Sequence, residues 1–163
     1  LGANKKYREW PYKYYAKIAQ KIHKKTGWLG LICGAENEFD LGEHIKKLCD
    51  APLQNYTGQT TLSELTCLLA KSQILISNET GTAHIANAVG MPTVCILGGG
   101  HFGRFVPYPE LSGKINNLKV VYYKMPCYGC DWKCVYHIKD EDPAPCISNI
   151  SVDAVWNEVK ILL

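Results

Sequence analysis

The residues best suited to chemistry lie in the stretch SNETGTAHIANAVGMP, residues 77–92. Apolar runs flank this stretch, so a buried strand is expected to end at its start and a helix to begin after Gly81. A glycine lets the backbone turn sharply, and the free N–H groups at a helix amino terminus attract phosphate. Thr80, Thr82 and His84 would add side-chain donors. The stretch therefore predicts a phosphate pocket, and a simple helix cap with a surface histidine is the alternative interpretation.

Two carboxylates in nearby loops could bind the hydroxyl groups of a sugar. Glu79 lies in the same loop, and Glu36 follows another expected strand in the sequence GAE. A carboxylate can accept two hydrogen bonds at once, which suits the vicinal hydroxyls of a ribose or of another sugar. Each side chain could equally be a solvated loop acid, and the residues alone leave both interpretations open.

The elements that must position these residues alternate between helix and strand. Helices are expected at about 12–25, 39–48, 62–72 and 152–162, with a further helix after Gly81, and strands at 28–33, 73–77, 93–97 and 118–123. Strands that are almost continuously apolar and flanked by helices predict an α/β fold, a Rossmann-like parallel sheet with helices on both faces. Ligands bind such sheets at the carboxyl ends of the strands, where the polar loops of this chain lie.

Composition and charge narrow the class of protein. The 163 residues are 47% hydrophobic and 20% charged, which is typical of one soluble globular domain. The formal net charge is +3, and eight of the 18 Lys and Arg residues fall in the first 25 positions. This basic helix surface could be merely solvated, or it could contact an anionic membrane or an acidic acceptor. We expect a cytoplasmic protein, with peripheral contact at the inner membrane as an alternative, and no nucleic-acid partner.

The start of the chain bears on its domain organisation. The sequence Leu1-Gly2-Ala3 looks like the end of a strand whose body is missing. We therefore expect residues 1–163 to be a single Rossmann-like domain from a longer protein, with a neighbouring domain upstream. The cysteine-rich segment 125–148 belongs to the same domain.

Four stretches, in order, resemble the carboxyl-terminal domain of the family 9 glycosyltransferases, the bacterial lipopolysaccharide heptosyltransferases and their relatives. They are GANKKYREWP, CGAENE, TGQTTLSELTCLLAKSQILISNETGTAHIANAVGMPTVCILG and CYGCDWKC…CISNIS. The resemblance implies one half of a two-domain GT-B enzyme whose amino-terminal domain holds the glycolipid or glycan acceptor and the catalytic base. This chain would be the half that binds the nucleotide-diphospho-sugar donor, in the synthesis of lipopolysaccharide or another surface glycan.

The resemblance also implies a role for each matching residue. The backbone at Thr80 and Gly81, with His84, would hold the donor diphosphate, and Arg8 would stabilise its charge in the transition state. The other expected donor contacts are Asn4 near the phosphates, Glu36 at the ribose, Thr60 beside the base and Glu79 at sugar hydroxyls. No cofactor is expected for transfer, because cationic side chains and helix N–H groups can stabilise the leaving group without a metal.

Two features depart from the family pattern. The family usually has Asp where this chain has Glu79, so the sugar need not be heptose. After Leu97 the family's usual Gly-Pro is replaced by Gly-Gly-Gly-His in a loop at 98–108. That loop could carry His101 or Arg104 toward the sugar, or it could simply be mobile.

Four of the eight cysteines are spaced C-x2-C-x3-C-x11-C within the segment 125–148, and they are Cys127, Cys130, Cys134 and Cys146. Such spacing suits a structural zinc site with four thiolate ligands, or with His137 as a substitute. Reduced packed thiols and a disulfide are the alternatives. The remaining four cysteines lie in apolar patterns, where a free thiol acts as a small hydrophobic group.

Two other functions remain open from the sequence. One is a nucleotide-sugar epimerase-like domain, against which the Trp-Pro and Thr-Gly-x-x-His motifs argue. The other is a non-catalytic, zinc-stabilised binding module. If the chain is the donor-binding half, it should bind a nucleotide sugar alone but transfer little. The sugar, the base, the acceptor and the oligomeric state do not follow from the sequence.

Overall fold

The computed structural model describes residues 1–3, 5–108, 117–139 and 142–163. Asn4, an expected phosphate contact, lies outside the described residues. The described strands are β1 (Gly30–Ile32), β2 (Leu53–Asn55), β3 (Leu75–Asn78), β4 (Thr93–Ile96) and β5 (Leu118–Val121). The described α-helices are α1 (Tyr12–Thr26), α2 (Phe39–Leu48), α3 (Leu62–Lys71), α4 (Gly81–Ala88), α5 (Pro145–Ser148) and α6 (Val152–Leu162). Three 3-10 turns accompany them, η1 (Lys6–Arg8), η2 (Glu36–Glu38) and η3 (Gly99–His101).

All of the paired strands run parallel, as apolar strands flanked by helices predict. β1 pairs with β2, with Gly30 opposite Leu53. β4 lies between β3 and β5, with Thr93 opposite both Leu75 and Leu118. Within the described residues, these ladders form two groups, β1–β2 and β3–β4–β5, instead of the one continuous sheet expected. The α/β class is confirmed.

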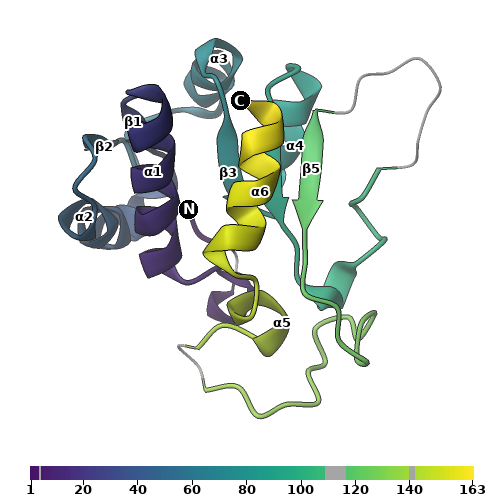
Figure 1. Ribbon diagram of the computed structural model, residues 1–163. Coiled ribbons are helices and arrows are strands. Elements are labelled where there is room, and N and C mark those ends of the chain that lie inside the picture. The colour runs from purple at the N-terminus through teal and green to yellow at the C-terminus, as the bar shows by residue number, and fades with distance from the viewer. Residues whose placement is uncertain (4, 109–116, 140–141) are drawn as a thin grey trace.

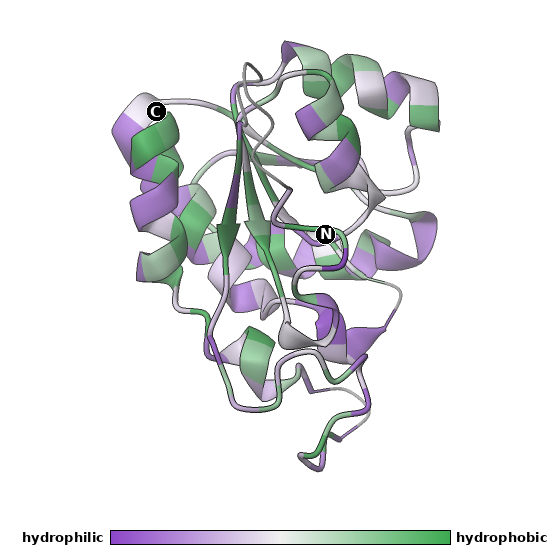
Figure 2. Cartoon of the chain, turned by 90° about the vertical axis from the view of Figure 1, so that its right-hand side faces the viewer, coloured by the Kyte–Doolittle hydropathy of each residue, from purple (hydrophilic) through white to green (hydrophobic). Residues whose placement is uncertain are grey.

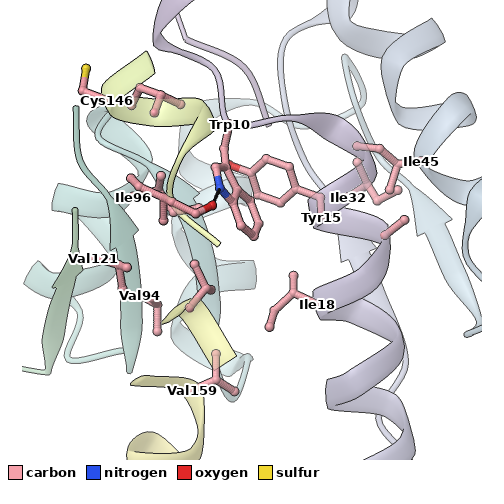
Figure 3. Close-up of a cluster of buried hydrophobic side chains, with 14 of the residues drawn as sticks. Trp10, Tyr15, Ile18, Ile32, Ile45, Val94, Ile96, Val121, Cys146 and Val159 are labelled. Carbon is pink, nitrogen blue, oxygen red and sulfur yellow. Dashed lines mark hydrogen bonds between the residues drawn. The ribbon is translucent and has the colours of Figure 1, made fainter. Parts of the chain in front are cut away.

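Helices cover both faces of the strands. Figure 1 shows α6 over one face of β3–β5 and α4 over the other, and Figure 2 shows the strands between these helical layers. The larger core lies on the side of α1 and α6, where Trp10, Ile18, Val94 and Val159 converge (Figure 3). None of the described helices combines the length and the apolar character that a membrane crossing requires.

Most of the expected elements are present, and two short ones were not expected. The helices at 39–48 and 152–162 have the expected bounds, and the capping box predicted to start α3 is formed by Thr61 and Glu64. β2 was missed because its sequence is Leu-Gln-Asn, which has no apolar run. It is held instead by pairing with β1 and by the side chain of Asn55, which donates to the carbonyl of Phe39 at 3.1 Å.

Trp10 ties the amino-terminal segment to both β3 and the carboxyl-terminal part of the chain. Its side chain is 2% exposed, and its indole N–H donates to the carbonyl of Ile150 at 2.8 Å (Figure 3). Its backbone N–H donates to the side chain of Asn78 at 3.0 Å. Asn78 is the last residue of β3, so these bonds fix the segment that carries Arg8 beside the end of that strand.

Candidate functional site

The centre of the site is the connection from β3 to α4. β3 ends at Asn78 and α4 begins at Gly81, so only Glu79 and Thr80 separate a buried strand from a helix amino terminus. The side chain of Thr80 makes no capping hydrogen bond, which leaves the first N–H groups of α4 without a partner from that side chain. Such N–H groups, together with the positive end of the helix dipole, favour an anion.

Gly81 differs in one respect from its expected role. Its backbone is not in the left-handed region, so the turn itself does not require glycine. A Cβ atom at this position would meet no atom within 4 Å. The chain therefore turns sharply between β3 and α4, as expected, but without a backbone conformation that only glycine favours. The open space beside Gly81 is nevertheless what a ligand would need to approach the helix terminus closely.

Three of the expected polar residues meet at this helix terminus. Arg8 Nη2 lies 3.0 Å from Glu79 Oε2, and it also donates to the backbone carbonyl of Glu79 at 3.4 Å. His84 Nε2 lies 3.7 Å from the other carboxylate oxygen, Glu79 Oε1. The carboxylate side chain is 9% exposed and the arginine side chain 19%. Glu79 thus lies between two groups that can each carry positive charge, and it is not a freely solvated loop acid.

Tyr108 holds the other nitrogen of the His84 ring. The phenol oxygen of Tyr108 forms a hydrogen bond with His84 Nδ1. Burial raises the pKa of Tyr108, so its hydroxyl keeps its proton at neutral pH. If that proton is donated to Nδ1, the ring proton sits on Nε2 and faces Glu79 and the open end of the site.

The cysteine-rich segment supplies the wall behind Arg8. The guanidinium of Arg8 lies over the ring of Trp132, 5.1 Å from its centroid, a cation–π contact that orients the charged group. Trp132 and its neighbour Asp131 both have left-handed backbone conformations, with φ of 61° and 49°. Non-glycine residues adopt this region rarely, and a cluster of them is typical of functional sites.

The loop at 98–108 packs against the same segment. Both His101 Nε2 and Arg104 Nη1 contact the carboxylate oxygen Oδ1 of Asp131, at 3.3 and 3.2 Å. The loop was expected either to carry His101 or Arg104 toward the sugar or to be mobile. Instead, both side chains point to Asp131 rather than to Glu79, and these contacts anchor the loop. The residue that this loop does bring to the site is Tyr108.

A cavity of about 530 Å³ adjoins the helix terminus at the carboxyl ends of β1 and β3. Thr80 lines it, and so does Thr60, whose place beside the nucleotide base stays a prediction. Glu36, expected at the ribose, is exposed and is not among its lining residues. Glu38 lines the cavity instead, but its Oε2 already accepts a hydrogen bond from the N–H of Ala35 at 2.7 Å.

The structure thus brings most of the expected residues into two adjoining groups. Arg8, Glu79 and His84 form the polar cluster, and Thr80 leads from that cluster to the cavity that contains Thr60. Sequence reasoning missed other contributors, which are Asn78, Tyr108, Trp132 and Glu38. Of these, only Asn78 had a local signal, as a polar residue at the end of an apolar strand.

The four late cysteines do not form a metal centre in this arrangement. Across the described ranges, which include all four, no three His, Cys, Asp or Glu side chains are placed to hold a metal ion. All four thiols are free. Cys146 is buried in α5, where it accepts a hydrogen bond from the N–H of Gly99 at 3.4 Å, and burial raises its pKa. The described arrangement thus holds the four thiols unbridged, and zinc binding by them stays a prediction.

One acidic pattern in the chain bears on the expectation of transfer without a metal. Residues 140–142 read Asp-Glu-Asp, the Asp-x-Asp pattern of metal-dependent transferases. The first two of these residues lie outside the described ranges, and Asp142 is exposed. The triplet lies within the cysteine-rich segment and does not follow a strand of the sheet, so no metal role is derived from it.

Comparison with known proteins identifies relatives of this chain. The sequence signature of glycosyltransferase family 9 (heptosyltransferase) matches residues 1–134. The lipopolysaccharide core heptosyltransferase OpsX of Haemophilus influenzae is 28% identical over 116 residues, which are 70% of this chain and 33% of that protein. Lipooligosaccharide heptosyltransferase 2 of Campylobacter jejuni is 24% identical over 159 residues, 95% of this chain and 47% of that protein. The chain spans less than half the length of these two relatives.

Two solved structures share the fold. One is described as Escherichia coli ADP-heptose lps heptosyltransferase II, which matches with a TM-score of 0.74 and 20% identity over 99% of this chain and 44% of that one. The other is a glycosyl transferase family 9 protein from Veillonella parvula, with a TM-score of 0.78 and 18% identity over the same shares. In both cases the described chain corresponds to about half of a GT-B glycosyltransferase.

Proposed function

Because the chain belongs to glycosyltransferase family 9, the heptosyltransferase family, we propose that it is the domain that binds the nucleotide-diphospho-sugar donor. Residues 1–163 would be one domain of a longer enzyme, which acts in the synthesis of bacterial lipopolysaccharide or a related surface glycan. The acceptor and the catalytic base would be held by the other domain.

The observation that carries this proposal is the polar cluster at the amino end of α4. Arg8 and His84 both contact Glu79, a Cβ at Gly81 would meet no atom within 4 Å, and a cavity lined by Thr80 adjoins this turn. A diphosphate placed at the helix terminus would receive its N–H groups and the charge of Arg8. Its nucleoside would extend toward Thr60 in the cavity. Asn4 and Glu36 remain proposed contacts that depend on the bound state.

The chemistry proposed is transfer of a glycosyl group. The bond between the anomeric carbon and the diphosphate oxygen breaks, and a bond from that carbon to an acceptor hydroxyl oxygen forms. The hydroxyl proton passes to the base in the other domain, and the nucleoside diphosphate leaves with the electron pair. Arg8 and the amino end of α4 would stabilise the charge that develops on the leaving oxygen, an effect typically worth about 3 kcal/mol for each aligned donor.

The donor that the structural comparison favours is an ADP-sugar. The E. coli protein whose structure shares this fold is described as an ADP-heptose enzyme, and we propose the same class of nucleotide here. The sugar is less constrained, because the carboxylate expected to bind its hydroxyl groups, that of Glu79, forms an ion pair with Arg8 at 3.0 Å. We propose that a sugar hydroxyl competes with Arg8 for this carboxylate while the guanidinium turns toward the diphosphate.

We also propose that the enzyme works in the cytoplasm and reaches a membrane glycolipid by peripheral contact. The basic surface of α1 supports an attraction to anionic lipid. Part of that surface is already neutralised, since Lys21 forms an ion pair with Asp153 of α6 at 3.2 Å. The attraction should therefore be weak and should fall as salt is added.

Calorimetric titration of the full-length protein with ADP, UDP, GDP and CDP tests the proposal. We expect one diphosphate, ADP, to bind at least tenfold more tightly than the others. Arg8→Ala should weaken that binding about tenfold or more, whereas Lys25→Ala, a change in an exposed cation on α1, should leave it unchanged. No binding of any nucleotide would reject the proposal in favour of a non-catalytic module.

A further inference from the structure

Asp131 is a charged residue that lies outside the polar cluster but between two segments that both reach it. Its carboxylate oxygen Oδ1 accepts a hydrogen bond from Arg104 at 3.2 Å and lies 3.3 Å from Nε2 of His101. Its backbone N–H donates to the carbonyl of Gly100 at 3.1 Å. Asp131 therefore joins the loop at 98–108 to the cysteine-rich segment.

The next residue, Trp132, connects Asp131 to Arg8. The ring of Trp132 lies under the guanidinium of Arg8, with 5.1 Å to the ring centroid, and it packs against the ring of Tyr7 at a centroid distance of 5.5 Å. Asp131 and Trp132 both have left-handed backbone conformations, which non-glycine residues rarely keep without support from their surroundings. The contacts of the Asp131 carboxylate supply such support, so they help to fix the ring beneath Arg8.

Phe105 connects the same carboxylate to His84. The ring of His101 packs edge-on against Phe105 at a centroid distance of 5.5 Å, and the guanidinium of Arg104 lies 5.2 Å from the centroid of the same ring. Phe105 in turn packs edge-on against His84, with 6.5 Å between the centroids. The two side chains that contact Asp131 therefore hold the ring that packs on His84.

Glu79 joins the far ends of these two connections. One of its carboxylate oxygens lies 3.0 Å from Arg8, and the other lies 3.7 Å from His84. Arg8 and His84 are thus linked directly through Glu79 and, at longer range, through Asp131. We call the connection through Trp132 to Arg8 the first arm, and the connection through Phe105 to His84 the second arm.

Two buried nitrogen atoms show how much the aromatic rings depend on Asp131. Within the described residues, Nδ1 of His101 and Nε1 of Trp132 are buried without a hydrogen-bond partner. Buried polar groups are usually paired, and an unpaired one costs stability. In the described part of the chain, the polar contact of the His101 ring is the one with Asp131. An arrangement that retains such costs beside two left-handed residues is typical of a functional site.

We propose that Asp131 is a positioning residue for the donor site and acts on it through both arms. Its carboxylate fixes Trp132 beneath Arg8 and Phe105 beside His84, so the two groups on either side of Glu79 are held in place together. This inference rests on the proposed function, in which Arg8 meets the donor diphosphate. The first arm should therefore matter most for nucleotide binding, because Arg8 carries the charge that attracts the phosphates.

Asp131→Asn tests the proposal, because asparagine keeps the size of the side chain and tolerates the left-handed backbone. In the ligand-free full-length protein, the NMR resonances of the Arg8 guanidinium and of the His84 ring should both shift. ADP affinity should fall about two- to fivefold, the usual value of one exposed ion pair. Asp153→Asn is the matched control, since Asp153 is an exposed residue paired with Lys21 at 3.2 Å, and it should change none of these measurements.

A double-mutant cycle separates positioning from a general loss of stability. If Asp131 acts on Arg8 through Trp132, the loss of ADP affinity in Asp131→Asn combined with Trp132→Leu should be smaller than the product of the two single losses. Losses that multiply in full would overturn the proposal, and so would unchanged resonances of Arg8 and His84 in Asp131→Asn. Arg104→Gln removes the same ion pair from the other side and should give the same shifts, which keeps the test decisive if Asp131→Asn folds poorly.

Failure of this inference can be distinguished from failure of the proposed function. If the parent protein binds no nucleoside diphosphate, the proposed function fails, and the resonances of the ligand-free protein still decide whether Asp131 is coupled to Arg8 and His84. If the parent protein binds ADP and Asp131→Asn changes neither the affinity nor the resonances, the inference alone fails.

Discussion

Arg8 is the residue on which the proposed site depends, because contacts with two distant parts of the chain hold it. Glu79 binds it at 3.0 Å, and the ring of Trp132 lies under its guanidinium. The local sequence around Arg8 contains no sign of either partner, which are 71 and 124 positions further along the chain. Motif matching could therefore place Arg8 in the site, but not the side chains that orient it.

At Gly81 the open space gives a sharp test of the phosphate position. Gly81→Val should leave Tm nearly unchanged, because a Cβ there meets no atom within 4 Å. It should weaken ADP binding by roughly tenfold or more, since the branched side chain occupies the space where the phosphate approaches the helix. Titration and thermal unfolding of the same preparation measure both effects.

Ala88→Val, at the exposed far end of the same helix, serves as the control and should leave ADP affinity unchanged. Unchanged affinity in Gly81→Val as well would show that the donor does not contact the start of α4.

Tyr108 offers a second test at the residue scale, because its hydroxyl bonds to Nδ1 of His84. Removing it in Tyr108→Phe should release the ring and mix its two neutral tautomers. The 15N chemical shifts of His84 report the tautomer directly, and ADP affinity should fall by roughly 2- to 10-fold, the usual value of one hydrogen bond. Tyr136→Phe, a change in an exposed residue, should alter neither measurement. A tautomer signal identical in the Tyr108 variant and the parent protein would contradict this role.

At the scale of elements, the sequence predicted what is determined locally. The apolar pattern gave the helix at 39–48 its observed bounds, and the cap at Ser151 did so for the helix at 152–162. β2 and α5 could not be predicted, since β2 exists through its pairing with β1 and α5 is only four residues long. The same limit applies to the ribose position, where Glu36 was expected but Glu38 lines the cavity. The sequence does not show which of these two acidic residues faces the cavity, because the 3-10 turn η2 sets the directions of their side chains.

The contact between the loop at 98–108 and the cysteine-rich segment gives an element-scale prediction. A Cβ at Gly100 would lie 2.4 Å from the ring of Trp132. Gly100→Ala should therefore lower the free energy of unfolding by about 1–3 kcal/mol, measured by urea denaturation. ADP affinity should fall with it, because Trp132 would be moved from beneath Arg8.

Gly81→Ala is the matched control for stability, since its added methyl group meets no neighbour and alanine favours the helix. A Gly100→Ala protein as stable as the parent would mean that the two segments are not packed together in solution.

For the whole molecule, the buried thiols make stability depend on alkaline pH. Burial raises the pKa of Cys95 from 9.0 to about 12, and it raises the pKa of Cys146 as well. Above pH 9 the unfolded chain loses these protons while the folded chain keeps them. The unfolded state then binds fewer protons, so stability must fall as pH rises.

Between pH 9 and pH 12, Cys95 alone should contribute a loss of at most about 1.4 kcal/mol per pH unit. Urea denaturation at pH 8, 9 and 10 under reducing conditions measures the slope. Cys95→Ala should flatten it, even though the cavity left by the thiol lowers stability at every pH. Cys67→Ala changes an exposed thiol and should keep the parent slope. Equal slopes in all three proteins would mean that Cys95 is accessible to solvent, and hence that β4 is not enclosed between the two helical layers as Figure 2 shows it.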